Sequence, residues 1–491
     1  MEQNRRDFLK GTAWMGLAAA AASGMGRDMK ITGGCGAPMQ GYADKPMETI
    51  RVGFVGLGSR GPSSVRRLAV LPGVKIIGLC DILPERVAAA NEWRVQHGYP
   101  KAREYTGPEG IKRMCAADDI DVIYSVTGWD AHHAINMCAM RNGKHVFTEM
   151  PGALTVEDLW EEVEASEKYR RHCMLLENCC YGEEEMLGLN IIRHGLLGEL
   201  YHGEAAYIHD QRGLGILPKD MPDKKRVYGG VARPAVGPTN KALYYEGVSH
   251  GNWYPTHGLG PVARAMNINR GDRFDYVVSM ESDQMCATAY GQALFPPDSW
   301  QAKMRYVRGD MSQSLIRTMK GRTIILQHDV MSPTPYSRMY KLAGTKGVFR
   351  KYPDLRFCWE DKIGDRHAER FFSDEKVAEM KEKYGHPLWK LAGDIAKKVG
   401  GHGGMDFVMD LRWSYCLRNG MPLDTDVYDL AAWSSMVELT RRSVDNRSAA
   451  VDVPDFTRGA WKNAAPFAPE TFDPAKLGLT GASDAGEQQK V

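Results

Sequence analysis

The sequence predicts an α/β protein with an N-terminal, doubly wound parallel sheet and a C-terminal α+β domain whose sheet is mainly antiparallel. Near-continuous apolar strands alternate with helical segments between residues 50 and 147, as in parallel sheets that are covered on both faces. Beyond residue 170 the strands alternate between apolar and polar side chains, which is typical of a sheet with one face on helices. The length of 491 residues also favours two domains.

The first predicted strand, Ile50–Val55, runs directly into a glycine-rich turn, and an apolar-periodic helix follows to Leu71. Glycines let the backbone approach a pyrophosphate closely, and the helix N-terminus offers it free N–H donors. This order of strand, turn and helix predicts a Rossmann dinucleotide site, whereas a plain tight turn is the alternative. The residues expected to contact the cofactor are Gly56, Gly58, Ser59, Arg60 and Gly61.

The second predicted strand, Val74–Asp81, ends on an acidic residue at the spacing from the glycines that ribose recognition requires. The Asp81 carboxylate can accept hydrogen bonds from both ribose hydroxyls, and its charge disfavours a 2′-phosphate. The expected cofactor is therefore NAD rather than NADP.

The same alternation predicts the rest of this domain. Its elements are a helix at Pro84–His97, a strand at Ile120–Val126, a helix at Ala131–Arg141 and a strand at Lys144–Phe147. We expect an NAD-binding domain at residues 48–169, a substrate domain at 170–454 and a Pro- and Ala-rich tail at 455–491.

Four alternating segments predict the antiparallel sheet of the substrate domain: Leu200–Ile208, Asp275–Glu281, Arg322–Asp329 and Met339–Leu342. Between the first two lies Gly213–Gly251, a segment rich in Gly, Pro and Lys. We interpret it as a long irregular insertion that can overhang a site.

The N-terminus, residues 1–34, is predicted to be an export signal and linker. Asn4–Lys10 resembles a twin-arginine signal, and the apolar stretch Gly11–Ala22 is too short to span a bilayer. Because the twin-arginine route carries folded proteins, it suits an enzyme that acquires its cofactor before export to the periplasm; a basic helix start is the alternative. Thr32 stands where a lipoprotein signal needs Leu, which disfavours a lipid anchor at Cys35.

The charge balance narrows the class of partner. Lys and Arg (63 residues) nearly equal Asp and Glu (61), so no global field favours nucleic acid or an anionic membrane, and we expect a small-molecule or glycan partner. Several of the ten cysteines lie in apolar segments, which predicts buried free thiols rather than disulfides. No third ligand accompanies His132-His133 or the pair His402 and Asp406 at a recognisable spacing, so no metal site is expected.

Polar or aromatic side chains follow three predicted strands, at the sheet edge where open α/β sheets bind ligands. Trp129 and His132, which follow the predicted strand Ile120–Val126, can flank the nicotinamide; helix capping and packing are the alternative. The residues expected at this edge of the cofactor site are Trp129, His132, Glu149, Met150 and Asn178.

Four features together resemble the Gfo/Idh/MocA oxidoreductase superfamily: the glycine turn, Asp81, Glu149-Met150-Pro151 and Gly344-Thr345-Lys346-Gly347. Dehydrogenases of that superfamily commonly have Glu-Lys-Pro in place of Glu149-Met150-Pro151, where the Lys assists proton transfer from the oxidised hydroxyl. Met150 cannot carry a proton, which disfavours a net dehydrogenase and requires another acid and base.

Within that superfamily, three further segments resemble glycoside hydrolase family 109: Glu177–Gly182, Tyr254–Pro261 and His402–Asp406. The similarity covers roughly Ile50 to Pro454 and implies removal of terminal α-linked N-acetylgalactosamine from a glycan. The family usually has an Arg about a dozen residues before the Tyr254 block that helps to bind substrate. The matching position here is Ala242, so the preferred sugar can differ.

His257 and Tyr254 are candidate catalytic residues by chemistry alone. An imidazole titrates near neutrality, and residues three apart share one face of a helix start; a packed aromatic ring and a helix-capping His are the alternative. By resemblance, His257 and Tyr207 handle protons, while Tyr254 and Tyr336 contact the sugar.

The family's mechanism implies that bound NAD takes a hydride from C3 of the sugar, which acidifies the C2 proton. A base removes that proton, the group on C1 is eliminated, water adds and the hydride returns. This route needs no pair of carboxylates around the scissile bond. An NAD(P)-dependent sugar oxidoreductase and a non-catalytic glycan-binding protein that keeps NAD are the alternatives, and a homo-oligomer is compatible with the sequence.

Overall fold

The computed structural model describes residues 36–212, 226–228, 231–233, 249–364, 369–467 and 470–478. The predicted signal with Cys35, most of Gly213–Gly251 with Ala242, and the end of the tail lie outside the described residues. Gly36–Val491 is one compact unit. In the part of the chain that the structure describes, no helix combines the length and apolarity that crossing a membrane requires.

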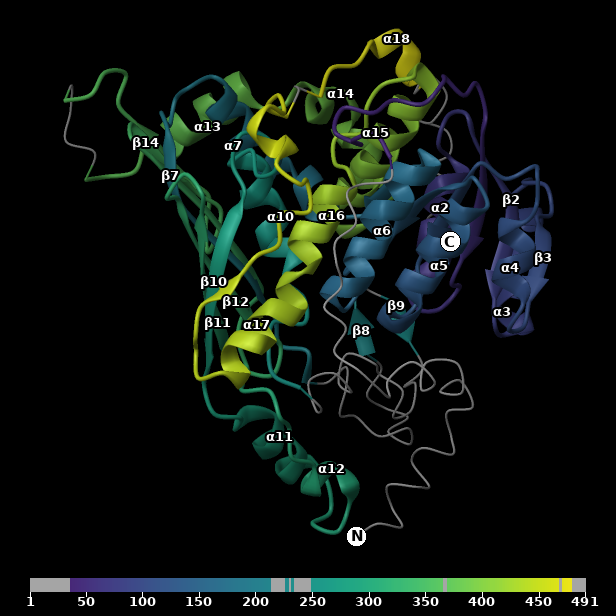
Figure 1. The fold of residues 1–491 in the computed structure, drawn as a ribbon, viewed down its shortest axis with the longest axis horizontal. Coiled ribbons are helices and arrows are strands. Elements are labelled where there is room, and N and C mark those ends of the chain that lie inside the picture. Colours follow the sequence, from purple (N-terminus) through teal and green to yellow (C-terminus); the bar gives the residue numbers. More distant parts are fainter. Residues whose placement is uncertain are drawn as a thin grey trace. The chain divides into compact units, whose positions relative to one another are not determined.

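The N-terminal half holds a six-stranded parallel sheet in the order β3-β2-β1-β4-β5-β6, which confirms the predicted doubly wound fold (Figure 1). Its strands are short and largely buried because helices cover both faces. They are β1 (Ile50–Val55), β2 (Val74–Asp81), β3 (Arg103–Thr106), β4 (Val122–Ser125), β5 (His145–Thr148) and β6 (Cys173–Leu175).

Five helices connect these strands, and the strand order reverses between β1 and β4. A ligand is expected in the crevice outside the strand ends at such a reversal. Thr155 caps the last of the helices, because its side chain accepts from the Asp158 N–H at 3.1 Å. The helices are α2 (Gly61–Ala69), α3 (Pro84–Gln96), α4 (Gly110–Cys115), α5 (Trp129–Arg141) and α6 (Val156–Tyr169).

The sheet continues beyond the predicted end of the nucleotide domain at Tyr169. The strand β6 pairs in parallel with β5 after that residue, so the boundary derived from the sequence is too early. The three residues of β6 are all buried and apolar, and the expected strand before Asn178 therefore belongs to the parallel sheet.

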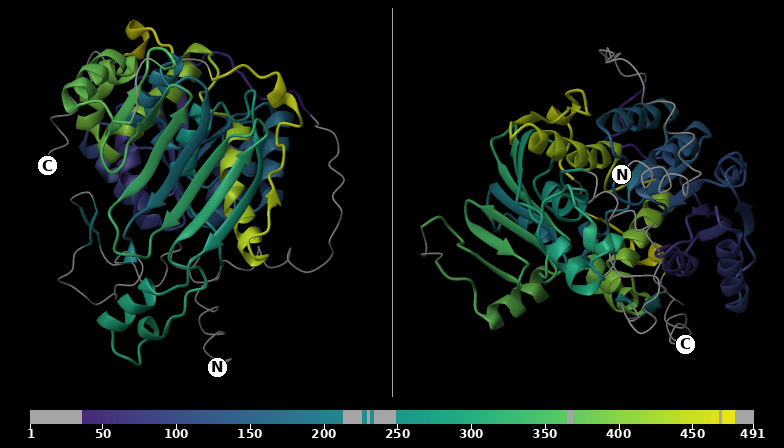
Figure 2. Two further views of the ribbon diagram at one scale, coloured as in Figure 1. Left: turned by 90° about the vertical axis from the view of Figure 1, so that its left-hand side faces the viewer. Right: turned by 90° about the horizontal axis from the view of Figure 1, so that it is seen from below.

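The C-terminal half holds an eight-stranded sheet in the order β15-β14-β13-β7-β12-β11-β10-β16. All its neighbours are antiparallel except β12 and β7, which confirms the mainly antiparallel prediction. Figure 2 shows one face of this sheet in front of the helices. The strands are β7 (Leu200–Ile208), β10 (Phe274–Glu281), β11 (Ser312–Thr318), β12 (Thr323–Asp329), β13 (Ser337–Gly344), β14 (Gly347–Arg350), β15 (Arg356–Trp359) and β16 (Val451–Asp452).

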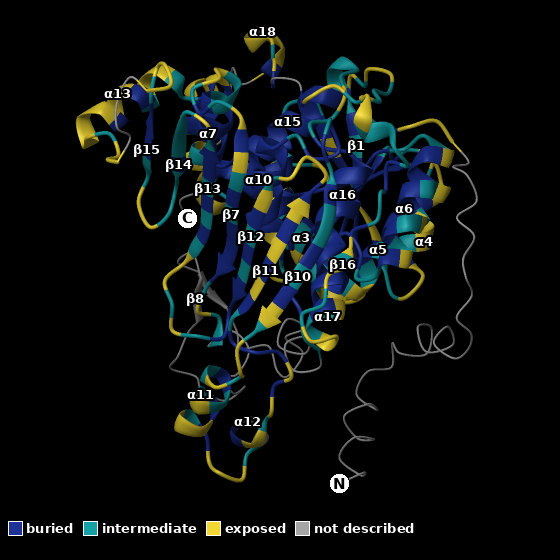
Figure 3. Ribbon diagram, turned by 60° about the vertical axis from the view of Figure 1, so that its left-hand side comes forward, coloured by how far each residue is buried: buried dark blue, intermediate teal, exposed yellow. Residues whose placement is uncertain are grey.

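Burial alternates strictly along β11, as expected for a sheet with helices on one face (Figure 3). The helices α10 (Thr256–Ala265) and α17 (Met436–Asp445) pack against the sheet. The remaining described elements are η1 (Asn178–Tyr181), α7 (Glu183–Arg193), β8 (Arg226–Tyr228), β9 (Val231–Arg233), α11 (Cys286–Leu294), α12 (Trp300–Lys303), α13 (Asp374–Tyr384), α14 (Pro387–Val399), η2 (His402–Gly404), α15 (Met405–Asn419), α16 (Val427–Ser434), η3 (Ala460–Lys462) and α18 (Pro474–Leu477).

The helix α15 packs against α14, η1 and the strand β1 of the parallel sheet. It is buried on every side along most of its length, and its Asp410 accepts hydrogen bonds from two residues of the nucleotide domain. Arg67 Nε donates to Asp410 at 2.5 Å, and the Tyr124 hydroxyl donates to the same carboxylate at 3.0 Å. Buried charges persist only where they are paired in this way, so these contacts fix the cofactor domain against the rest of the protein.

The predicted tail is anchored rather than loose where the structure describes it. Glu470 is buried and forms ion pairs with Arg193 of α7 and Arg264 of α10. The tail therefore contributes to the core of the substrate domain, although its sequence has no periodicity that would predict this. The nine described cysteines are free thiols, as expected.

Candidate functional site

Three glycines shape the turn between β1 and α2, each for a different reason. Gly56 has a φ of +93°, and a Cβ there would lie 2.3 Å from the Val126 carbonyl oxygen. A Cβ on Gly61 would lie 2.3 Å from the carbonyl oxygen of Gly56, so this residue lets the helix start close to the turn. A Cβ on Gly58 would meet nothing nearer than Arg86, at 3.7 Å. The open side of Gly58 and the uncapped N-terminus of α2 fit a pyrophosphate.

The Asp81 carboxylate lies beside this turn and is almost fully buried. It accepts from the Leu57 N–H at 2.7 Å and from the Leu83 N–H at 3.0 Å. Each carboxylate oxygen has a second lone pair, so Asp81 can hold the turn in place and still accept from a ribose hydroxyl. The donor and acceptor set therefore fits NAD.

Glu149 and Arg60 meet at the ends of β5 and the glycine turn. Arg60 Nε donates to Glu149 Oε1 at 2.8 Å, and Arg60 NH1 lies 3.5 Å from His402 Nε2. Met150 follows in the chain and is 2% exposed. Its thioether cannot move a proton, so proton transfer at this site falls to other side chains.

Trp129 and His132, which follow β4, lie in different surroundings. Trp129 stacks on Tyr254 with ring centroids 5.7 Å apart, which places it among the aromatic rings of the site. His132 is fully buried, with Nδ1 2.7 Å from the Pro151 oxygen and Nε2 3.2 Å from the Thr127 oxygen. Burial lowers the pKa of this imidazole, so the packing role left open by the sequence accounts for His132.

His257 lies in the first turn of α10, and a buried carboxylate fixes its ring. Its Nδ1 is 2.7 Å from Glu177 Oε1, which also accepts from the Cys179 N–H at 3.1 Å. Burial opposes the charge of Glu177, but the His257 imidazole and these hydrogen bonds outweigh it and hold the pKa of Glu177 below its usual value. An Nδ1–H that donates to this carboxylate leaves Nε2 to exchange protons with a substrate.

Close packing of α10 on β7 brings His257 to Tyr207. A Cβ on Gly258 would lie 2.4 Å from the backbone nitrogen of Ala206, so only glycine allows this approach. The ring centroids of Tyr207 and His257 are 5.4 Å apart, and Tyr254 and His257 are 4.7 Å apart. The sequence predicted that Tyr254 and His257 share a helix face. Because α10 begins at Thr256, Tyr254 instead precedes the helix.

Burial keeps the hydroxyls of Tyr254 and Tyr336 neutral. Burial, followed by the nearby Glu149 and Tyr207, raises the pKa of Tyr254 well above its usual value. Burial also raises the pKa of Tyr336. Tyr336 lies 6.0 Å from Tyr207 between ring centroids, and its hydroxyl accepts from Arg338 at 2.9 Å. These phenols are suited to binding sugar hydroxyls, whereas the imidazole is the better resting base.

His257, Tyr207 and Tyr336 line one cavity of about 430 Å³. A larger cavity of about 740 Å³ lies beside β2 and β3, but the predicted site residues lie elsewhere. We place the site in the smaller cavity because titratable groups converge there. Its lining includes Tyr207, His209, His257, Tyr336, Arg338, Lys351, Tyr352, Trp389 and His402.

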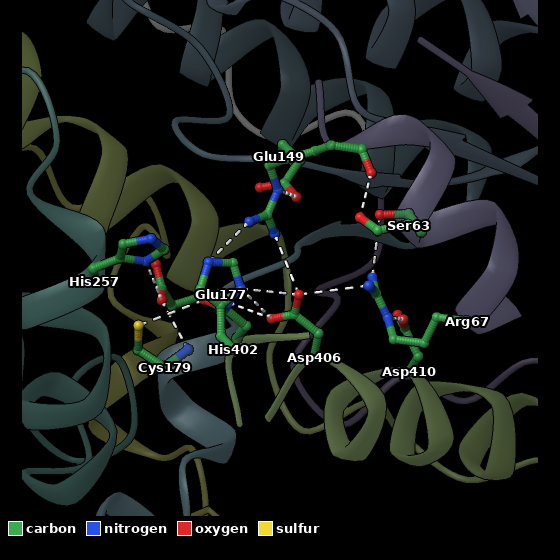
Figure 4. Close-up of polar contacts among 12 residues, drawn as sticks. Ser63, Arg67, Glu149, Glu177, Cys179, His257, His402, Asp406 and Asp410 are labelled. Carbon is green, nitrogen blue, oxygen red and sulfur yellow. Dashed lines mark hydrogen bonds and ion pairs between the residues drawn. The ribbon is translucent and has the colours of Figure 1, made fainter. Parts of the chain in front are cut away.

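Asp406 is a functional candidate to which the sequence assigned no role. Figure 4 shows the polar contacts that run from Glu149 to Asp410 past His402 and Asp406. Asn178 Nδ2 donates to Asp406 Oδ1 at 2.5 Å, and His402 Nδ1 lies 3.1 Å from Oδ2. The signal in the sequence is the four-residue spacing of His402 and Asp406.

One group of described residues has ligand atoms close enough to hold a metal ion. Atoms of Glu177, Cys179 and His257 lie within 4.8 Å of one another. Burial raises the pKa of the Cys179 thiol well above its usual value. A metal there would also have to replace the hydrogen bond between His257 and Glu177.

Family models match both halves of the chain. Residues 50–176 match the NAD-binding Rossmann fold of an oxidoreductase family, and residues 181–463 match the C-terminal domain of glycosyl hydrolase 109. The match to an NAD-binding Rossmann domain, together with the geometry of the glycine turn, identifies NAD as the cofactor of this chain.

Two curated relatives are similar over nearly the whole chain. A glycosyl hydrolase family 109 protein of Shewanella pealeana is 42% identical over 472 residues, which are 95% of this chain and 99% of the relative. An alpha-N-acetylgalactosaminidase of Shewanella oneidensis is 42% identical over 484 residues, which are 98% and 99%. A levoglucosan dehydrogenase structure with NADH and levoglucosan shares the fold at 17% identity, with a TM-score of 0.58 over 83% of this chain and 100% of that one.

Proposed function

The chain belongs to glycosyl hydrolase family 109, and we propose that it uses NAD to remove terminal α-linked N-acetylgalactosamine from a glycan. One observation carries this proposal: the His257–Glu177 pair shares a cavity with Tyr207 and Tyr336, next to a glycine turn built for NAD. The name of the Shewanella oneidensis relative supports the choice of sugar.

When bound, NAD would be held by the glycine turn and Asp81 and would supply the hydride acceptor and donor for C3 of the sugar. The residues of the chain move the protons. His257 Nε2 takes the C2 proton once C3 is oxidised, and Glu177 stabilises the imidazolium that forms. Tyr207 assists in proton transfer, and the neutral hydroxyls of Tyr254 and Tyr336 bind the sugar.

Release of p-nitrophenol from its α-N-acetylgalactosaminide, with no NAD added, tests the proposal. We expect steady turnover by the protein as purified with its NAD, and the same assay on related α- and β-glycosides ranks the sugars that Ala242 allows. If no glycoside is cleaved while NAD is bound and a free sugar is oxidised instead, the chain is a sugar oxidoreductase. If a sugar binds and the NAD is never reduced, the chain is a glycan-binding protein.

His257→Ala should abolish p-nitrophenol release without unfolding the protein, because its imidazole is the proposed C2 base. Circular dichroism and the amount of bound NAD check that the fold is retained. Full activity of this variant would contradict the assignment.

We also propose export by the twin-arginine route to the periplasm, based on Asn4–Lys10. Replacing Arg5 and Arg6 by Lys should leave the enzyme in the cytoplasmic fraction of its host. An unchanged distribution between the fractions would contradict export by this route.

A further inference from the structure

The cavity of about 740 Å³ lies at the edge of the parallel sheet, beside the start of β2 and the edge strand β3 (Figure 1). We propose that it binds a small organic anion, a phosphate or carboxylate group carried on a sugar-sized body. Lys75 lies at the second position of β2 and Asp81 ends that strand, about 20 Å away at the usual rise per residue, so the cavity is separate from the glycine turn and Asp81. The inference goes beyond the proposed function and does not depend on it.

Arg94, in the last turn of α3, brings a buried positive charge to the wall of this cavity. It is 4% exposed, and both of its side-chain hydrogen bonds use Nη2, which donates to the Ile76 oxygen at 3.3 Å and the Pro100 oxygen at 2.9 Å. Among the described residues, Arg94 Nε has no hydrogen-bond partner. The two carbonyl oxygens satisfy one nitrogen of the guanidinium, but they carry no net charge.

Other buried arginines of the protein have a counter-charge that Arg94 lacks. Five of them each pair with a carboxylate: Arg67 with Asp410, Arg264 with Glu470, Arg270 with Asp429, Arg338 with Glu185 and Arg412 with Asp424. Arg94 forms no ion pair with a carboxylate of the described residues. Burial accordingly lowers the pKa of Arg94, and Tyr99 opposes this only in part. Because a buried charge is stable when it is paired, an anion from solution would complete this site.

The charges around Arg94 leave the cavity positive. Burial raises the pKa of Tyr99, so its phenol is neutral and supplies no negative charge to Arg94. Lys75 is exposed on β2, where it adds a second cation to the wall, and it forms no ion pair with a described residue. The two other cations of the wall are already paired: Lys101 with Glu104 at 3.0 Å and Arg103 with Asp119 at 2.8 Å. The charge left without a partner is therefore that of Arg94 and Lys75.

The rest of the wall suits the uncharged part of a ligand. Ile77 and Pro100 are apolar, and Tyr99 offers an aromatic ring against which the C–H face of a sugar can pack. The cavity is larger than a single inorganic phosphate and has the size of small-molecule sites in proteins. The two cations thus select an anion, and the apolar wall selects one with an organic body.

Isothermal titration calorimetry of the holoenzyme in Tris buffer tests the proposal with four probes: glucose 6-phosphate, glucuronate, inorganic phosphate and glucose. We expect a sugar anion to bind, inorganic phosphate to bind about tenfold or more weakly, and glucose to give no heat of binding. The tighter of the two sugar anions identifies the anionic group. Its affinity should fall as the salt concentration rises, because Lys75 is exposed.

Lys75→Glu reverses one charge of the wall at an exposed position and should weaken binding of the sugar anion about tenfold or more. Lys112→Glu is the matched control, because Lys112 is 67% exposed on α4 and pairs with Glu109 outside the cavity. This control should bind like the unaltered protein. Arg94→Gln should abolish binding, and if that variant fails to fold, Lys75→Glu decides alone.

Three results would overturn the proposal. The first is that the unaltered protein binds neither sugar anion. The second is that Lys75→Glu binds the sugar anion as tightly as Lys112→Glu does, which would place the binding elsewhere. The third is that inorganic phosphate binds as tightly as the sugar anion, or that glucose does, because the cavity would then select no organic anion.

Discussion

At the scale of single residues, the site depends on how a buried carboxylate fixes an imidazole. Glu177 is 2% exposed and lies 2.7 Å from His257 Nδ1, so it selects the tautomer and stabilises the charged ring. Glu177→Gln keeps an acceptor for the Cys179 N–H but removes the negative charge. We expect kcat to fall roughly 10²- to 10⁴-fold with little change in KM.

Steady-state kinetics on the p-nitrophenyl substrate measure this effect of Glu177→Gln. Glu104→Gln is the matched control, because this carboxylate lies on β3 and pairs with Lys101. A Glu177→Gln enzyme with the kcat of the control would show that the carboxylate has no part in proton transfer.

Glu177 and His257, together with Cys179, also raise the question of whether the site binds a metal ion. Glu177, Cys179 and His257 form a group with metal-ligand distances, but the thiol is neutral and the imidazole donates to the carboxylate. We therefore expect activity to survive prolonged dialysis against EDTA. Activity that is lost on dialysis and returns with one divalent cation would assign this group to a metal.

At the scale of elements, the sequence predicts strands well where their pattern is local. The bounds of β1, β2 and β7 match the prediction, since each is a long apolar or alternating run. The edge strand β3 was missed because Arg103 and Glu104 are exposed, and no apolar alternation marks it. The glycine turn and His257 were predicted because each belongs to a motif of consecutive residues, Gly56–Gly61 and Tyr254–Pro261.

Partners that are distant in the chain could not be predicted in the same way. Asp406 meets Asn178 and Arg67 only because α15 packs beside η1 and the parallel sheet. His402 faces the cavity from a turn with five successive positive φ values, which no local sequence pattern predicts. The burial of Glu470 likewise follows from cations on α7 and α10.

The close approach of α10 to β7 can be tested by adding a single Cβ atom at their contact. In Gly258→Ala the new Cβ would lie 2.4 Å from the Ala206 backbone nitrogen, and a strand backbone cannot give way as a side chain can. We expect the free energy of unfolding to fall by about 1–3 kcal/mol, as in overpacked cores, with loss of activity because Tyr207 and His257 move apart.

Gly393→Ala in α14 is the control, since its Cβ would meet only the Trp389 ring, at 3.1 Å. Replacing a helical glycine by alanine there should be neutral or stabilising by up to about 1 kcal/mol. Urea denaturation of both variants measures the difference. Equal stability of the two variants would mean that α10 can shift without cost.

At the scale of the whole molecule, buried ion pairs tie the cavity to the rest of the fold. Glu185 of α7 has 1% of its side chain exposed and pairs with Arg338 at 2.5 Å and Lys351 at 2.9 Å. Both cations belong to the cavity wall. Burial opposes the charge of Glu185, but the two cations outweigh it and lower its pKa from 4.5 to about 2.

Because the pKa of Glu185 is lowered in the folded state, the free energy of unfolding depends on pH in the acidic range. A carboxyl whose pKa is lower in the folded state stabilises the fold when ionised, so its contribution is complete above pH 4.5 and is lost as the pH falls through about 2. Glu185→Gln lacks that titration and leaves the cations without their partner. The unaltered protein and Glu185→Gln should therefore differ less in unfolding free energy as the pH falls from 4.5 to about 2, by about 3 kcal/mol.

Urea denaturation at several pH values between 2 and 5 measures that difference. Glu183→Gln on the same helix turn is the control, because Glu183 is 44% exposed and pairs with Lys397 at the surface. Exposed pairs contribute little to stability, so this variant should follow the unaltered protein throughout. A gap between Glu185→Gln and the unaltered protein that stays constant with pH would show that Glu185 is not ionised in the folded state. Arg338 would then lack this carboxylate partner, whereas Lys351 would keep Glu184.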